Sequence, residues 1–193
     1  TTLAVDIAEY ATNMGKRVLL VDLDARTPAL LRELKVQAGH GLADIVLQDG
    51  DPQALLQKCP GIPFHFLPMR PSAIDPLALV TSEKLHNALA SFRASFDLVL
   101  LDGPQIDGRV DALLLPELAD KVILVAKWGM RLQAAKDAAR ALGSSRVARL
   151  AEAAAPLCVV TQVPATEHWR LLGSVPAMPA SWPAACYRTP WRG

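Results

Sequence analysis

Stretches of continuous apolar residues alternate along this chain with stretches in which apolar residues recur every three or four positions. The continuous runs predict strands buried on both faces, and the periodic stretches predict amphipathic helices. This alternation is typical of an α/β fold, a parallel β-sheet flanked by helices on both faces. Strands are expected over residues 17–23, 64–67 (a short one between prolines), 97–101, 121–126 and 157–163. Helices are expected over residues 3–14, 30–34, 41–47, 52–58, 82–92, 110–118, 132–142 and 146–154.

The composition changes after residue 163. The last 30 residues contain five of the 15 prolines and three of the four tryptophans, with little periodicity. We therefore expect one folded domain over residues 1–163, and an irregular Pro/Trp-rich tail over residues 164–193. The net charge of +1 gives no support for a nucleic-acid partner. Three distant cysteines without metal spacing fit a reducing cytoplasm, and no apolar run is long enough to predict a membrane span.

Three aspartates follow apolar strands directly. Asp22 and Asp24 end the strand that begins near residue 17, and Asp102 ends the strand that begins near residue 97. The carboxyl ends of parallel strands form the edge at which open α/β sheets bind ligands. Carboxylates at that edge can hold Mg²⁺ beside a nucleotide, directly or through water. Because Mg²⁺ takes few protein ligands, one of the three can instead act as a base or orient the attacking oxygen.

Thr1 and Thr2 stand where the first helix begins. In a phosphate-binding loop, the hydroxyl that follows the lysine is a ligand of Mg²⁺, and the first amides of the helix bind phosphate. Threonine also caps many helices that bind nothing, so this pair alone is a weak signal. The sequence separation between Thr1 and Asp22 is long enough for one helix and one returning strand. This spacing strengthens the interpretation of the two threonines as part of a phosphate-binding site.

The pattern Asp22-x-Asp24-x-Arg26-x-Pro28 after an apolar strand resembles the second nucleotide motif, Walker A′, of the bacterial tyrosine kinases. These are cytoplasmic P-loop NTPase domains of the ParA/MinD-like group that act in exopolysaccharide and capsule chain-length regulators. Residues 97–104 resemble the Walker B motif of that family. Further similarity covers residues 41–46, 76–85, 119–125 and 159–163.

The resemblance implies an ATP- and Mg²⁺-dependent tyrosine kinase fold that lacks its first strand and phosphate loop. By that resemblance, Asp22 and Asp24 are catalytic, with Asp22 as the base or orienter for the tyrosine hydroxyl. Thr1, Asp24 and Asp102 are the residues linked to Mg²⁺. Nucleotide binding is assigned to Thr1, Thr2, Asp102 and Thr161. Arg26 either faces a phosphate or a neighbouring subunit, or is an ordinary surface arginine.

The family also implies partners and a location. We expect a membrane-bound polysaccharide co-polymerase or activator, separate or fused, and a homo-oligomer in the intact family. The domain is then cytoplasmic and lies at, or is tethered to, the inner membrane.

The sequence departs from the family pattern in segments that the family needs for catalysis. The chain opens as if cut just after the Walker A lysine, and residues 1–193 contain no glycine-rich loop followed by lysine. Such a loop supplies the amides and the charge that stabilise the transferring phosphoryl group. We therefore expect little or no catalysis by the chain as given, and its status as an enzyme stays open. The tyrosine-rich tail of the family is also absent, since Tyr10 and Tyr187 are the only tyrosines.

Two other functions remain open from the sequence. The first is a partitioning or cell-division ATPase of the ParA/MinD type, which shares the same core. The second is a degenerate, non-catalytic remnant that is inert or serves as a binding module for its membrane partner. Arg26 and Pro28 favour the kinase over the partitioning ATPase.

Overall fold

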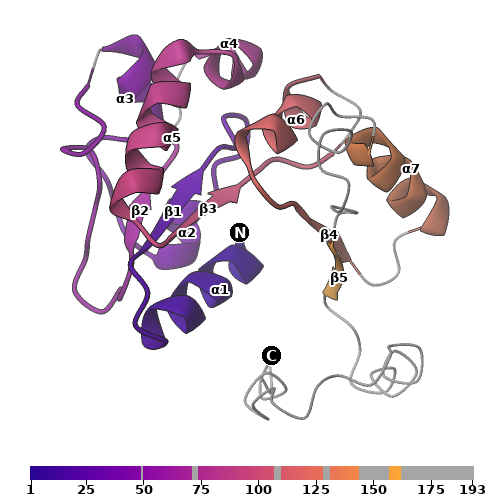
Figure 1. The fold of residues 1–193 in the computed structure, drawn as a ribbon, viewed down its shortest axis with the longest axis horizontal. Helices are drawn as coiled ribbons and strands as arrows, with labels where there is room; N and C mark the ends of the chain where they lie inside the picture. The colour runs from indigo at the N-terminus through magenta and orange to yellow at the C-terminus, as the bar shows by residue number, and fades with distance from the viewer. Residues whose placement is uncertain (49, 71–73, 107–109, 128–130, 144–156, 162–193) are drawn as a thin grey trace.

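The computed structural model describes residues 1–48, 50–70, 74–106, 110–127, 131–143 and 157–161, and helices alternate with strands through most of them (Figure 1). The helices are α1 (Thr2–Asn13), α2 (Leu30–Leu34), α3 (Leu42–Leu47), α4 (Pro76–Val80), α5 (Glu83–Ser95), α6 (Val110–Leu114), the 3₁₀ turn η1 (Leu115–Leu118) and α7 (Leu132–Gly143). The strands are β1 (Val18–Asp22), β2 (His65–Leu67), β3 (Leu98–Asp102), β4 (Ile123–Lys127) and β5 (Leu157–Thr161).

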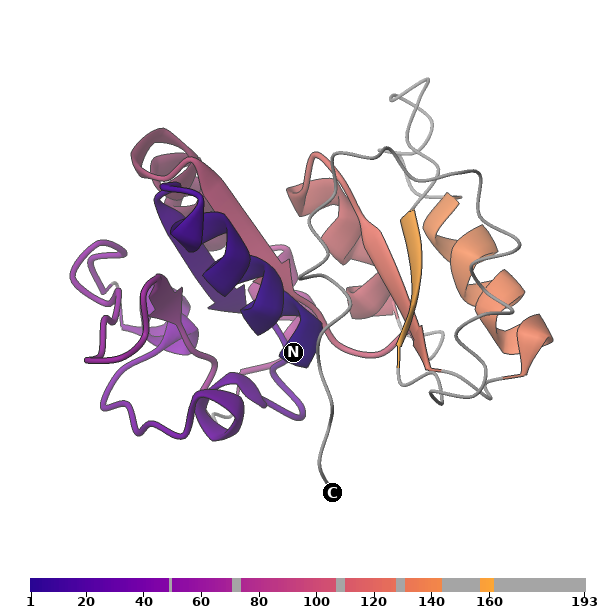
Figure 2. The same cartoon turned by 90° about the horizontal axis from the view of Figure 1, so that it is seen from below.

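The five strands within the described residues all pair in parallel, as the alternation predicts, but there they form two separate ladders instead of one sheet. The first has the order β2-β1-β3, and the second joins β4 to β5. In the first ladder, Val18 pairs with Leu98 and Asp22 with Asp102, so β1 and β3 end together. The second ladder lies on the far side of β3 from β2 (Figures 1 and 2).

Helices cover both faces of the first ladder, which confirms the predicted α/β architecture. On one face, Ala8 of α1 and Leu30 of α2 pack against Leu20 of β1. On the other face, Leu42 of α3 and Phe92 of α5 pack in one cluster with Val21 of β1. Every residue of β1 is buried, because this strand is central and continuously apolar.

Three of the predicted elements differ from the structure. The second strand expected to be buried on both faces, β3, is partly exposed at all five of its residues. Residues 52–58 form turns and one isolated bridge between Gln57 and Phe66, not a helix. Another strand expected to be buried on both faces, β4, buries Leu124 and Ala126 but leaves Ile123 and Val125 exposed. The predicted helix at 146–154 and the tail at 164–193 lie outside the described residues. No helix in the described part of the chain is long and apolar enough to cross a membrane.

Candidate nucleotide and magnesium site

Asp22 and Asp102 lie side by side at the carboxyl edge of the first ladder. They are register partners at the last positions of β1 and β3. Asp22 is completely buried, whereas Asp102 is partly exposed. Adjacent parallel strands that end in carboxylates place both groups at the edge where α/β sheets bind ligands. The structure therefore brings together two of the residues that the sequence singled out.

Thr1 joins this edge from the start of α1. Its hydroxyl donates to Asp102 Oδ2 at 2.5 Å, and its backbone nitrogen lies 3.1 Å from Asp102 Oδ1. Thr1 is the N-cap residue of α1, yet its side chain makes no capping bond to the helix. The side chain is instead committed to the strand-end carboxylate, which fixes the beginning of α1 beside β3. The unpaired amides of the first helical turn then start at the ligand-binding edge.

Asp22 organises the loop that leaves β1. Its Oδ1 accepts the backbone N–H of Asp24 at 3.0 Å, and its Oδ2 accepts the N–H of Leu30 at 3.2 Å. Burial raises the pKa of Asp22 to about 6, against the smaller lowering effect of these two N–H donors. The negative charges of Asp102 and Asp24 raise the pKa slightly further. A carboxyl group with a pKa near 6 is still mostly ionised at neutral pH and is more basic than an ordinary aspartate, as a general base requires.

Asp24 is bonded within its own loop. Its Oδ1 accepts the N–H groups of Arg26 and Thr27 at 3.0 and 2.9 Å, and its Oδ2 accepts the Thr27 hydroxyl at 2.6 Å. This is the geometry of an Asx turn, in which the carboxylate stabilises the backbone two and three residues on. Asp24 therefore shapes the loop between β1 and α2, and its oxygens retain lone pairs for a further ligand.

Arg26 makes an ion pair that the sequence did not predict. Its Nη2 donates to Asp111 Oδ1 at 2.8 Å, and its Nη1 donates to Asp111 Oδ2. Asp111 is 5% exposed and belongs to α6, so the pair ties the loop after β1 to that helix. The available signal was the single charged residue in the apolar run Val110–Leu114. This contact shows that Arg26 is not an ordinary surface arginine.

No contact in the described residues joins Thr2 or Thr161 to the cluster of Thr1, Asp22 and Asp102. Thr2 is exposed in the first turn of α1. Thr161 ends β5, where its backbone is the register partner of Lys127 in the second ladder, and its side chain lies outside what the structure describes.

The oxygen atoms at this edge suit a Mg²⁺ ion that keeps most of its water ligands, and not a metal ion fully coordinated by protein side chains. Within the described residues, no group of three or more His, Cys, Asp or Glu side chains is arranged to hold a metal ion. Mg²⁺ commonly takes one or two protein oxygens and keeps several waters. The neighbouring oxygens of Thr1 and Asp102 are hard donors of this kind, so these residues fit the ion.

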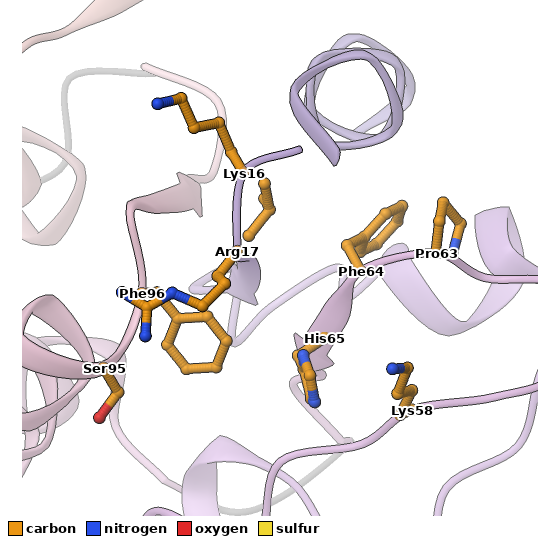
Figure 3. Close-up of a pocket in the computed structure, with 9 residues that line it drawn as sticks. Lys16, Arg17, Lys58, Pro63, Phe64, His65, Ser95 and Phe96 are labelled. Atoms are coloured by element: carbon orange, nitrogen blue, oxygen red, sulfur yellow. The ribbon is translucent and has the colours of Figure 1, made fainter. Parts of the chain in front are cut away.

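A separate hollow of about 340 Å³ lies at the opposite edge of the sheet (Figure 3). It is lined by the residues just before or at the amino ends of the strands, among them Lys16, Phe64, His65 and Phe96. The His65 and Phe96 rings meet edge to face, with centroids 5.4 Å apart. Because ligands of open α/β sheets bind at the carboxyl ends, this hollow is not part of the Asp22–Asp102 site.

The fold places the chain in the P-loop NTPase class. The "BceF Tyrosine Kinase Domain" structure matches with a TM-score of 0.69 and 26% identity, over 84% of this chain and 63% of that one. MinD of Pyrococcus horikoshii, solved with Mg-ADP, shares the fold at a TM-score of 0.56 and 21% identity, over 65% of this chain and 51% of that one.

In sequence, the chain is similar to proteins named as bacterial tyrosine kinases, as the motifs predicted. Tyrosine-protein kinase YwqD of Bacillus subtilis is 28% identical over 138 residues, 70% of this chain and 58% of that protein. The succinoglycan biosynthesis transport protein ExoP of Rhizobium meliloti is 26% identical over 130 residues, 66% of this chain and 16% of that protein.

The partitioning ATPases are also related. Chromosome-partitioning ATPase Soj of Thermus thermophilus is 35% identical over 105 residues, 54% of this chain and 40% of that protein. No protein-family model matches the chain. The matched part of the chain spans less than two thirds of each of these three relatives.

Proposed function

We propose that the chain forms the core of an ATP- and Mg²⁺-dependent protein-tyrosine kinase that acts in exopolysaccharide or capsule assembly. The observation that carries this proposal is the contact between Thr1 and Asp102, which joins a helix start to a strand-end carboxylate at the ligand-binding edge. The homology with YwqD and ExoP supports the reaction and the pathway class. The Mg-ADP complex of MinD, which shares the fold, supports the nucleotide.

Each predicted site residue then has a role. Thr1 and Asp102 hold Mg²⁺, which when bound neutralises charge on the phosphates. Asp24 contributes an oxygen to the same ion, directly or through water, while its other bonds keep the loop in shape. Asp22, with its raised pKa, accepts the proton of the tyrosine hydroxyl. Thr2 and Thr161 are assigned to nucleotide binding.

Phosphoryl transfer also needs the glycine-rich loop that residues 1–193 do not contain. We therefore propose that these residues alone bind Mg-ATP weakly and transfer phosphate slowly, if at all. Removing one electrostatic stabiliser of this kind typically costs about a hundredfold or more in rate.

The partner proposed from the same homology is a membrane-bound polysaccharide co-polymerase, separate or fused. In this proposal the domain works on the cytoplasmic side of the inner membrane and assembles with copies of itself, so that tyrosines of one copy are substrates of the next.

The test compares two proteins: residues 1–193, and the same residues preceded by a glycine-rich loop that ends in lysine. Binding of a fluorescent ATP analogue with and without Mg²⁺ is measured, followed by phosphate transfer to a tyrosine-containing copolymer. We expect the loop to tighten Mg²⁺-dependent binding and to permit transfer, and Asp102→Asn to abolish both gains. Asp97→Asn is the matched control, because Asp97 lies beside the other end of β3 and pairs with Arg17. Absence of binding in both proteins would overturn the proposal and favour a non-catalytic remnant or binding module.

The second candidate is a partitioning ATPase. The 35% identity with Soj across the 105 matched residues supports it. The same loop-bearing protein separates the two. ATP hydrolysis stimulated by DNA, without phosphotyrosine formation, supports the partitioning ATPase, whereas phosphotyrosine without DNA stimulation supports the kinase.

A further inference from the structure

The hollow of about 340 Å³ at the amino edge of the first ladder takes no part in the proposed kinase reaction (Figure 3). Its deepest lining is apolar, because Val18 at the start of β1 and Phe64 just before β2 are each only 1% exposed. Sites for small organic molecules commonly measure about 300–1,000 Å³. The hollow is therefore of a size that suits one small ligand.

Two aromatic rings form part of its wall. The imidazole of His65 and the ring of Phe96 meet edge to face, with centroids 5.4 Å apart and planes inclined at 65°. His65 is fixed as the first residue of β2, where it pairs with Leu19 of β1. Phe96 is fixed as the C-cap of α5, where its N–H donates to Phe92 O at 2.9 Å. Because backbone bonds hold both residues, the partly exposed rings present a preformed surface to another aromatic group.

The charge of the lining is positive. Its charged side chains are those of Lys16, Arg17 and Lys58, and the described residues that line the hollow include no acid. Arg17 is committed to a neighbouring carboxylate, since its Nη2 donates to Asp97 Oδ1 at 2.8 Å. Lys58 forms no ion pair or hydrogen bond with any described residue. Its side chain points toward His65 in Figure 3, whereas that of Lys16 points away from the group.

Lys58 and His65 are close enough for one to affect the other. Burial, and after it the positive charge of Lys58, lower the pKa of His65. The imidazole is therefore mainly uncharged at neutral pH, with one nitrogen that donates a hydrogen bond and one that accepts. This end of the hollow thus combines one uncommitted positive charge with a neutral hydrogen-bond donor, and both are complementary to a single negative charge.

We propose that this hollow binds a small aromatic carboxylate. The ring of the ligand lies against the rings of His65 and Phe96, over the apolar floor that Phe64 provides. The carboxylate lies beside the ammonium of Lys58, which gains the partner that it lacks in the described chain. A cation is excluded by the positive lining, and an anion without an apolar body would leave the floor unfilled. The ligand occupies the amino edge, so it does not compete with the nucleotide proposed for the edge of Asp22 and Asp102.

The test titrates the full chain with phenylacetate and follows the NMR signals of the lining residues. Phenylacetamide is the uncharged analogue, and acetate is the anion without a ring. We expect phenylacetate to shift the signals of His65, Phe64 and Phe96 with a dissociation constant on the order of 1 mM, as suits a ligand of this size. The other two compounds are expected to bind at least about fivefold more weakly, because each lacks one of the two interactions.

Lys58→Gln removes the charge at an exposed position and should leave the fold intact. We expect it to weaken phenylacetate binding by about fivefold and to leave phenylacetamide binding unchanged. Lys121→Gln, also exposed but just before β4 and outside the lining, is the matched control and should change neither.

Equal affinity for phenylacetate and phenylacetamide would overturn the proposal, and so would equal weakening by Lys58→Gln and Lys121→Gln, which would reflect general charge. Signal shifts centred on Asp102 would also overturn it, because the ligand would then lie at the carboxyl edge. The readout needs no nucleotide, so it succeeds or fails independently of the proposed kinase activity.

Discussion

Arg26 and Asp111, 85 positions apart, are joined by a two-pronged ion pair between the loop after β1 and helix α6. The side chain of Asp111 is 7% exposed and that of Arg26 is 33% exposed. The two partners are therefore not equivalent, because only the guanidinium retains access to water if the pair is broken.

This asymmetry predicts that Arg26→Ala destabilises the fold more than Asp111→Asn does. Removing the arginine leaves a buried carboxylate without its guanidinium partner, at a cost of about 2 kcal/mol. Removing the charge of Asp111 leaves an arginine that can turn toward solvent, at a cost of about 1 kcal/mol. Urea unfolding of both variants and the double variant checks this. Equal losses, or additive losses in the double variant, would contradict it.

Asp22 predicts an unusual dependence of stability on pH. Its pKa in the folded protein is about 6, above the ordinary value of 3.8. The folded state then binds more protons than the unfolded state between pH 4 and 6, so the free energy of unfolding falls as the pH rises through this window. A shift of this size corresponds to roughly 3 kcal/mol. Urea unfolding from pH 4 to 7 is expected to show this loss, and Asp22→Asn is expected to flatten the curve.

Asp97 serves as the control with the opposite sign. Hydrogen bonds from Arg17 lower the pKa of Asp97 to about 2. Its favourable contribution is present above about pH 4 and is lost as the pH falls toward 2. Asp97→Asn should therefore leave the slope between pH 4 and 6 unchanged. A flattened slope in this variant would assign the effect to general charge and not to Asp22.

The sequence predicted the class of the fold and much of the carboxyl edge. The continuous apolar run before Asp22 predicted a buried strand, and β1 is buried throughout. The burial of β4 was predicted wrongly because an apolar run does not reveal whether a neighbour covers each face, and Val125 remains exposed. Residues 52–58 form turns, as the bridge of Gln57 to Phe66 holds that segment against β2.

The sequence predicted the site residues that directly follow a buried strand, but not the contacts and pKa values that depend on tertiary packing. Asp22 and Asp102 could be placed together because parallel strands end at one edge. The partner of Arg26 could not, since Asp111 lies far along the chain on a short helix and has no motif of its own. The raised pKa of Asp22 likewise follows from burial, which sequence spacing does not report.

The contact of Thr1 with Asp102 predicts a difference between two neighbouring threonines. Thr1→Val keeps the shape of the side chain but removes the hydroxyl that donates to Asp102. We expect a loss of about 1–2 kcal/mol in the free energy of unfolding, since the acceptor is charged and partly buried. Thr2→Val, one residue on and exposed, is expected to change stability by less than about 0.5 kcal/mol. Equal effects in thermal unfolding would show that the hydroxyl contact does not hold α1 at the edge.

Gly41 predicts a close-packing requirement at the start of α3. A β-carbon at Gly41 would overlap the carbonyl oxygen of Pro68, which also accepts the N–H of Leu42 at 2.8 Å. Gly41→Ala must therefore push apart two backbones that are hydrogen-bonded, and displace the N–H that donates to Asp44 Oδ2 at 2.7 Å. We expect a loss of about 1–3 kcal/mol, the usual cost of overpacking. Gly39→Ala is the matched control, because nothing lies within 4 Å of a β-carbon there. Denaturant midpoints that fall equally in both variants would point to backbone flexibility in this loop, and not to contact with Pro68, as the source of the loss.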